Sequence, residues 1–332
     1  MSDSENSTTF TRDGAGNLDQ TLRPNTWEEY VGQTKIKENL RILLTAARER
    51  GHAAEHILLY GPPGLGKTTL AHLISKTLGT NMRTTSGPAI ERVGDLAAIL
   101  TNLSPGDVLF IDEIHRLSKS IEEVLYPAME SGVLDIIIGK GPSARTVQLE
   151  LPPFTLVSAT TRISLLSAPL RSRFSGGTFR LEFYKDSEIA QILHRSAELL
   201  GITTSEEIMN NIARRCRATP RTANYLLKRC RDLAQLEKGE LTPDIVDRTF
   251  ELLEIDTLGL GAPDRAVLDS IINKFNGGPV GLNTIAAATG EEQSTIEDVI
   301  EPYLIRQGLL ERTPRGRIAS ATAYSHIETQ TL

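Results

Sequence analysis

Short apolar runs alternate with helical repeats through the first half of the chain. The runs are typical of strands buried on both faces, and they lie at residues 56–60, 82–85, 107–111 and 154–161. The segments between them repeat their apolar residues with a helical period, as at residues 69–78. Strands that alternate with helices predict a parallel sheet with helices on both faces. Such a sheet binds ligands at the carboxyl ends of its strands.

One segment breaks this alternation before the last of these strands. Val133–Ile138 and Thr146–Leu151 are both strand-like, and Gly139–Arg145 joins them with two glycines and a proline. The pattern predicts a β-hairpin inserted at about residues 133–151. The three consecutive isoleucines at 136–138 cannot all face one core if the hairpin projects outward. This arm is either partly buried or a surface that binds a partner, and both interpretations stay open.

Only helical patterns follow from Asp186 to about Ile255, which predicts a small all-α domain. Thr204 is followed three residues later by Glu207, as in a capping box at a helix start. Thr242 precedes Pro243, a proline suited to the first position of a helix.

The last part of the chain, from Pro263 onward, changes pattern again. Three helical repeats are followed by two short strands around a Pro-Arg-Gly turn at residues 314–316. Three helices that end in a hairpin describe a winged helix. Such a domain contacts either nucleic acids or proteins, because a fold does not determine its function.

Composition narrows the class of protein. The 332 residues are enough for two or three domains, and the net charge of −6 excludes a uniformly basic coat for nucleic acid. Cys216 and Cys230 show no metal-binding or redox spacing. Residues 1–19 are rich in Ser, Thr, Asn and acids, and we expect them to be disordered. No secretory signal is visible and no apolar run approaches the ~20 residues of a membrane helix, so we expect a soluble cytoplasmic protein.

The strongest chemical motif is Gly61–Thr69, which reads Gly-Pro-Pro-Gly-Leu-Gly-Lys-Thr-Thr between a strand and a helix. Glycines such as Gly64 and Gly66 let backbone N–H groups wrap around a phosphate, and the helix N-terminus adds partial positive charge. Lys67 would reach the β- and γ-phosphates, while the Thr68 hydroxyl would complete a Mg²⁺ shell. A chance glycine-rich turn would rarely combine this spacing with these flanks.

Acidic and hydroxyl residues end two neighbouring strands. Asp112 suits Mg²⁺ binding, and Glu113 suits polarising the attacking water. Thr161, at the end of the next strand, has a hydroxyl that could sense the γ-phosphate. His115 is interpreted as a surface or packing histidine rather than a catalytic one.

Several arginines are candidates for phosphate contacts. Arg173 follows a short helical segment, and hydrolysis needs a positive charge that a neighbouring subunit can supply. Arg221 begins a helix of the small domain and could fold over the nucleotide. In the C-terminal hairpin, a basic turn suited to the DNA backbone contains Arg312, Arg315 and Arg317.

These residues together resemble the RuvB family of AAA+ ATPases, the bacterial motors of Holliday junction branch migration. The resemblance covers Leu22 to about Tyr324, and its most specific runs are Gly61–Thr69, Ser86–Ala89, Gly106–Arg116, Leu125–Glu130, Gly139–Arg145, Leu181–Tyr184 and Arg312–Arg317. It implies a large ATPase domain at 20–183, a helical lid domain at 184–256 and a winged-helix domain at 257–332.

The resemblance also implies roles for individual residues. Lys67, Asp112, Glu113, Thr161, Arg173 and Arg221 would be catalytic, with Thr161 the first sensor, Arg221 the second sensor and Arg173 acting on the neighbouring subunit. Thr68 and Asp112 would serve Mg²⁺. The ATP pocket would include Leu22, Arg23, Tyr30, Gly64, Gly66, Lys67, Thr68, Thr69, Glu130, Ser131, Gly132, Arg173, Tyr184 and Arg221.

The implied function is an ATP-driven homo-hexameric ring that draws duplex DNA through its centre. A RuvA-type protein would dock on the hairpin, and a RuvC-type resolvase is a further implied partner. The alternative is an ATP-dependent loader or switch that acts on DNA-bound proteins without processive movement.

Three departures from the family pattern limit what the resemblance implies. Gln293 stands where an arginine is frequent, Ser175–Gly177 is one residue longer than usual, and Ser131–Gly132 replaces an acid and a bulky residue. The first puts a DNA contact at Gln293 in doubt, and the second the structural support of Arg173. The third puts in doubt whether residues 130–132 face the nucleotide.

Overall fold

The computed structural model describes residues 18–138, 145–237 and 239–331. Most of the predicted N-terminal tail and most of the Gly139–Arg145 run lie outside these residues. Helix α1 (Leu18–Thr21) begins within the predicted tail. The chain forms two compact units, which are described separately: residues 25–183, and residues 184–332 together with the segment before Asn25.

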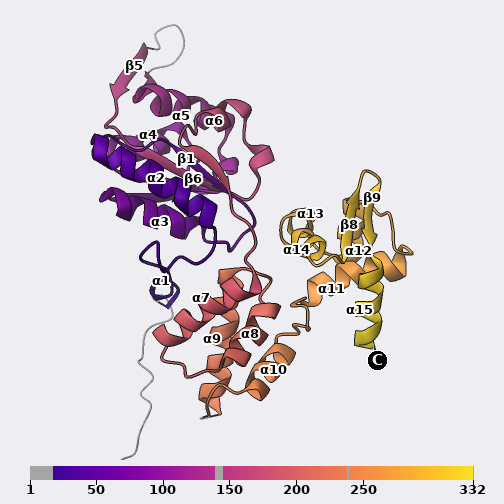
Figure 1. The fold of residues 1–332 in the computed structure, drawn as a ribbon. Coiled ribbons are helices and arrows are strands. Elements are labelled where there is room, and N and C mark those ends of the chain that lie inside the picture. Colours follow the sequence, from indigo (N-terminus) through magenta and orange to yellow (C-terminus); the bar gives the residue numbers. More distant parts are fainter. Residues whose placement is uncertain (1–17, 139–144, 238, 332) are drawn as a thin grey trace, which may run out of the picture. The chain divides into compact units, whose positions relative to one another are not determined.

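The first unit is built on a parallel five-stranded sheet of order β2-β3-β6-β1-β7 (Figure 1). The strands are β1 (Ile57–Tyr60), β2 (Met82–Ser86), β3 (Val108–Asp112), β6 (Thr155–Thr160) and β7 (Gly177–Arg180). The first four confirm the predicted strands. Strand β7 escaped prediction because it is a short edge strand with alternating exposed residues, and it begins at the second of two consecutive glycines.

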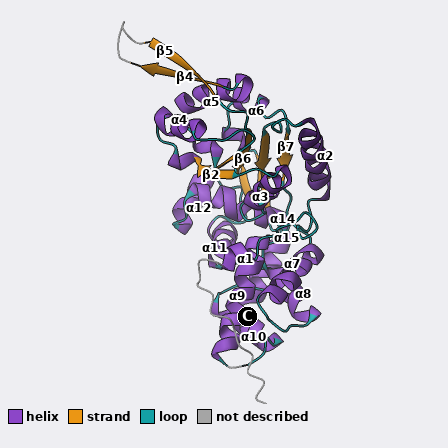
Figure 2. Cartoon of the chain, turned by 90° about the vertical axis from the view of Figure 1, so that its left-hand side faces the viewer, coloured by secondary structure: helices purple, strands orange, loops and turns teal. Residues whose placement is uncertain are grey.

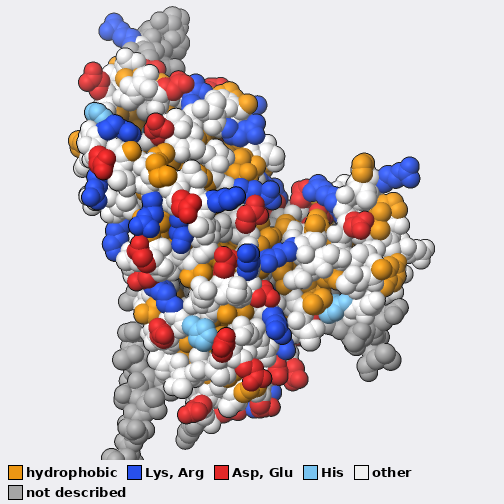
Figure 3. Space-filling model, viewed as in Figure 1, with side chains coloured by type: hydrophobic (Ala, Val, Ile, Leu, Met, Phe, Trp, Pro, Cys, Tyr) orange, Lys and Arg blue, Asp and Glu red, His pale blue; other side chains and the backbone are white. Residues whose placement is uncertain are grey.

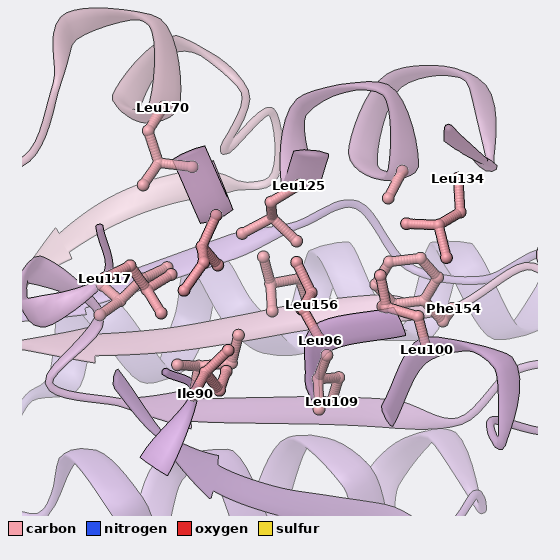
Figure 4. Packing of buried hydrophobic residues seen from close by; sticks show 14 of the residues in the cluster. Ile90, Leu96, Leu100, Leu109, Leu117, Leu125, Leu134, Phe154, Leu156 and Leu170 are labelled. Atoms are coloured by element: carbon pink, nitrogen blue, oxygen red, sulfur yellow. The ribbon is translucent and has the colours of Figure 1, made fainter. Parts of the chain in front are cut away.

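Helices cover both faces of this sheet, as predicted. Figure 1 shows α2 (Thr34–Arg50) and α3 (Lys67–Leu78) on one face, and α4 (Val93–Thr101) and α5 (Lys119–Ser131) on the other. The second face is closed by an apolar cluster in which α4 and α5 side chains meet strand side chains (Figure 4). Its fully buried members include Leu96, Leu100, Leu125, Leu109 and Leu156. This packing makes the sheet a rigid base for the residues at its edge.

The predicted hairpin is present between α5 and β6. Strands β4 (Val133–Ile138) and β5 (Arg145–Glu150) pair antiparallel and extend from the end of α5 (Figure 2). Leu134 at its base is fully buried, whereas Val147 and Leu149 are more than one-third exposed. For the three isoleucines at 136–138 the structure describes the strand but not the side chains. Both interpretations of that arm, partly buried or partner-binding, therefore stay open.

The second unit begins with the predicted helical domain, made of α7 (Asp186–Leu199), α8 (Glu206–Arg215), α9 (Pro220–Leu236) and α10 (Pro243–Leu252). The helix start at Thr242 and Pro243 is confirmed. The cap predicted at Thr204 is wrong, because the next residue, Ser205, accepts the hydrogen bond from Ile208 N. Helix α7 begins at Asp186, after an N-cap at Lys185.

The winged-helix pattern is confirmed at the end of the chain. Its helical part comprises α11 (Ala262–Asp269), α12 (Leu282–Thr289), α13 (Gln293–Thr295) and α14 (Glu301–Arg306), with π-helical turns at Ser270–Lys274 and Ile296–Ile300. Strands β8 (Leu310–Thr313) and β9 (Gly316–Ala319) form the wing. One further helix, α15 (Ala321–Thr331), was not predicted. Within the described ranges, no helix is both long and apolar enough to span a bilayer.

Candidate functional site

The glycine-rich loop follows β1 and leads into α3 with a backbone that only glycine adopts easily. Gly61, Gly64 and Gly66 all have positive φ values, of 143°, 80° and 95°. A Cβ atom on Gly61 would lie 2.6 Å from Leu181 O, and one on Gly66 would lie 2.9 Å from the Tyr30 hydroxyl. The loop is therefore a close-fitting backbone cradle that begins a helix, the geometry expected of a phosphate site.

Lys67 lies within this loop rather than in solvent. Its Nζ atom donates to Gly61 O and Pro62 O, each at 2.8 Å. Burial lowers the pKa of Lys67 to about 8, and the nearby charges of Asp112 and Glu113 oppose this shift. Lys67 is thus within electrostatic range of both predicted carboxylates.

Asp112 is the last residue of β3 and Glu113 follows it, while Thr160 ends β6 at the same edge of the sheet. Glu113 adopts a left-handed backbone with φ 49°, which is unusual for a residue with a side chain. Gly87 lies against this turn so closely that a Cβ atom there would be 2.4 Å from Glu113 O. The position of the carboxylate therefore depends on a glycine from the loop after β2.

The predicted sensor segment contacts the same region. Thr160 is buried, and its hydroxyl lies 2.9 Å from His115 Nδ1 and accepts from Arg162 N. Thr161 is the next residue and is half-buried. His115 therefore links the turn after Glu113 to the end of β6, a contact that its position in the sequence did not reveal.

Arg173 caps α6 (Ala168–Ser172) and is held against α5. One Nη atom lies 3.1 Å from Glu130 Oε1 and another donates to Pro169 O at 2.7 Å. The guanidinium also lies over the Tyr126 ring, 4.4 Å from its centroid. The structure thus brings Glu130 and Arg173 together, with Ser131 and the left-handed Gly132 at the end of the same helix.

Other predicted pocket residues divide between the two units. Tyr30 is buried in the first unit and donates to Leu65 O at 3.3 Å, so it supports the cradle from outside. Thr68 and Thr69 are half-buried in the first turn of α3. In the second unit, Arg195 donates to the carbonyls of Leu22 and Arg23.

Two further predicted residues lie in the second unit. Tyr184 is buried, and its carbonyl accepts from Arg306. Arg221 is exposed and is the second residue of α9, after the N-cap Thr219.

The three arginines of the wing have different environments. Arg317 is buried, and its Nε donates to Glu301 Oε1 at 2.5 Å. Arg312 lies 2.9 Å from Glu297 Oε1 and is about half exposed, while Arg315 is exposed at the turn. The prediction that Arg317 contacts DNA is therefore corrected, because its charge is neutralised inside the domain and it holds the hairpin on α14.

Charge on the surface is mixed. On the face in view in Figure 3, Lys and Arg side chains lie among Asp and Glu side chains. No group of three or more His, Cys, Asp or Glu side chains within the described residues could hold a metal ion. A Mg²⁺ ion at Thr68 and Asp112 would need phosphate or water oxygens to complete its shell, as Mg²⁺ commonly does.

Family models match almost the whole described chain. Residues 22–181 match the Holliday junction DNA helicase RuvB P-loop domain, residues 184–256 the RuvB AAA lid domain, and residues 257–328 the RuvB C-terminal winged helix domain.

Individual relatives agree with these matches. The Holliday junction branch migration complex subunit RuvB of Dehalococcoides mccartyi (strain CBDB1) is 58% identical over 311 residues, which is 93% of this chain and 89% of that protein. The solved RuvB Holliday junction branch migration motor of Thermotoga maritima superposes with a TM-score of 0.86 at 48% identity, over 93% of this chain and 99% of that one. A mutant of the same protein gives a TM-score of 0.86 over 92% and 98%.

Proposed function

From the premise that this chain belongs to the RuvB family, we propose that its ATP hydrolysis drives branch migration of Holliday junctions. The observation that carries this function is the glycine cradle with Lys67, Asp112 and Glu113 gathered at one sheet edge. It occurs in a chain with RuvB-type lid and winged-helix domains. The loader or switch alternative is not favoured, because similarity extends over all three domains to branch migration proteins.

The cradle residues would hold the nucleotide. Backbone N–H groups from Gly64 to Thr69 and the Lys67 ammonium suit phosphate oxygens. Thr68 and Asp112 would hold Mg²⁺, which neutralises phosphate charge when bound. Tyr30 supports the cradle from behind, while Leu22, Arg23, Tyr184 and Arg221 are the proposed pocket residues of the second unit.

Glu113 is the proposed residue that orients and polarises the attacking water. Thr161 is the proposed first sensor and Arg221 the second. The contact of Thr160 with His115 supports the first assignment, since it anchors the end of β6 to the turn after Glu113.

Arg173 is proposed to complete the site of a neighbouring subunit in a hexameric ring. Its contacts with α5 and α6 of its own subunit support this, because they would hold the guanidinium in a fixed position from which to reach the neighbour. Glu130 contacts Arg173 directly, so Glu130, Ser131 and Gly132 would approach the neighbour's nucleotide together with it.

DNA would be contacted by Arg312 and Arg315, the two wing arginines with exposed side chains. The hairpin at 133–151 would dock a RuvA-type protein, and the exposed Val147 and Leu149 support this role. Contact with a RuvC-type resolvase and a cytoplasmic location are further parts of the proposal.

A branch migration assay tests the proposal. The protein is mixed with a RuvA-type partner, ATP, Mg²⁺ and a synthetic four-way junction, and release of the migrated duplex products is followed. Glu113→Gln is the matched control: we expect it to bind ATP but to slow turnover by about 100-fold or more. ATP hydrolysis without product release would refute the motor, and rapid turnover by the variant would refute the role of Glu113.

A further inference from the structure

Tyr126 is the residue beneath the Arg173 guanidinium. It lies on α5, half-buried against the apolar cluster. The Arg173 Cζ atom is 4.4 Å from the centroid of its ring, within the range of a cation–π contact. Arg173 Nε is buried and finds no hydrogen-bond partner among the described residues. The ring face therefore supports a part of the guanidinium that hydrogen bonds do not hold.

The Tyr126 hydroxyl is itself fixed by two contacts. It donates to Glu122 Oε2 at 2.9 Å, and its oxygen lies 2.9 Å from Ser167 Oγ. Ser167 is the N-cap of α6 and accepts from Leu170 N. Tyr126 thus joins α5 to the helix that ends at Arg173.

The chemistry of these groups suits a fixed platform. Desolvation by burial raises the pKa of Tyr126, so the phenol stays protonated and can donate to Glu122. Glu130 Oε1 and Pro169 O contact the Nη atoms of the same guanidinium. Together these contacts restrict a long side chain that would otherwise occupy many rotamers.

We propose that Tyr126 is a positioning residue for hydrolysis in trans: its ring holds the Arg173 guanidinium ready for the neighbouring subunit's nucleotide. This rests on the proposed function, in which Arg173 acts across the subunit boundary. Placement of a charged group before the reaction raises the rate without changing how substrate binds. Loss of the ring should therefore lower kcat and leave the KM for ATP unchanged.

Mixed rings test this by placing one substitution on either side of the boundary. Acceptor subunits carry Arg173→Ala and keep the cradle, whereas donor subunits carry Lys67→Ala and keep the arginine. Steady-state ATP hydrolysis of the mixture is measured with full-length protein on duplex DNA. Tyr126→Leu is then introduced into the donor alone or into the acceptor alone, and Tyr126→Phe into the donor.

Tyr126→Leu in the donor should lower kcat of the mixture about three- to tenfold at unchanged KM. The same substitution in the acceptor should leave kcat unchanged, because that subunit has no arginine to position. Tyr126→Phe in the donor should keep most of the activity, since the ring remains.

Three results would overturn the inference. Equal losses from Tyr126→Leu in donor and acceptor would mean that Tyr126 only stabilises the fold. Full activity with the donor variant would show that Arg173 needs no platform, and a Phe variant as slow as the Leu variant would assign the effect to the hydroxyl. A mixture without Tyr126 substitutions that regains no activity would instead refute the trans role of Arg173, and with it the premise.

Discussion

The sheet edge and the wing both contain a cluster of charged residues, but they are built in different ways. At the sheet edge, the loop after β1 and the end of β3 place Lys67 within electrostatic range of Asp112 and Glu113. In the wing, three arginines share one hairpin, yet Arg317 is buried, Arg312 is ion-paired and Arg315 is exposed. The position of a residue that backbone geometry sets can thus be predicted from the sequence around it. The role of an arginine in the wing depends instead on partners that are distant in sequence.

The largest expected effect is on the stability of the wing, and it distinguishes the buried Arg317 from the exposed Arg315. Arg317→Ala removes the cation that is hydrogen-bonded to the buried Glu301 and leaves only Arg312 Nη1, 3.8 Å from Glu301 Oε2. Loss of one partner of a buried ion pair costs up to about 3–5 kcal/mol. We expect the free energy of opening of β8 and β9 to fall by about this amount. Hydrogen–deuterium exchange of residues 310–319 measures it.

Arg315→Ala is the matched control in the same hairpin. It should leave exchange unchanged but reduce the salt dependence of DNA binding by about one unit of the logarithmic slope. If Arg317→Ala leaves exchange unchanged, the buried ion pair does not hold the wing.

A second test examines whether backbone geometry really positions Glu113. Gly87→Ala would bring a Cβ atom to 2.4 Å from Glu113 O, so the turn must move. We expect kcat for ATP to fall about tenfold, with the KM little changed, because the carboxylate shifts while the cradle remains. Steady-state hydrolysis measures both constants.

Gly94→Ala is the control for this substitution. A Cβ atom there would meet nothing within 4 Å, so kcat should stay at its original value. Normal turnover by Gly87→Ala would show that the turn can move without affecting the water.

The smallest expected effect concerns the charge of Lys67. Its pKa is lowered from 10.5 to about 8, so below pH 8 the ammonium that phosphates need is already present. Above that pH the lysine of the ATP-free protein loses its proton, and binding must restore it. ATP affinity should therefore fall as the pH rises above about 8, by at most about tenfold per unit.

Calorimetric titrations between pH 7 and 9.5 would measure this change. Lys67→Arg keeps its charge throughout this range, so any binding that it retains should show no such decline. A decline of equal size in both proteins would assign the effect to another group.

Much of the fold could be predicted from local patterns, and the exceptions are instructive. Thr242 with Pro243 predicted a helix start correctly, whereas Thr204 was displaced by Ser205, because adjacent hydroxyl residues compete for one cap. Strand β7 has too few apolar residues for its pattern to be visible, and only pairing with β1 makes it a strand.

The candidate site also has a part that the sequence predicted and a part that it did not. Positions that backbone geometry sets, such as Gly61, Gly66 and the end of β3, followed from motif spacing. The support of Arg173 by Tyr126 and of Thr160 by His115 did not, since each contact joins residues about 45 positions apart or more.

Local chemistry along the chain was enough to predict the parallel sheet, the phosphate cradle and the strand that ends in two carboxylates. These features depend on residues that are close in sequence, such as glycines with positive φ and apolar runs next to turns. The tertiary structure decided which charges are buried, which are paired and which ring lies under Arg173. Such outcomes depend on the partners that packing brings together, because the energy of a charge is set by its surroundings rather than by its neighbours in sequence.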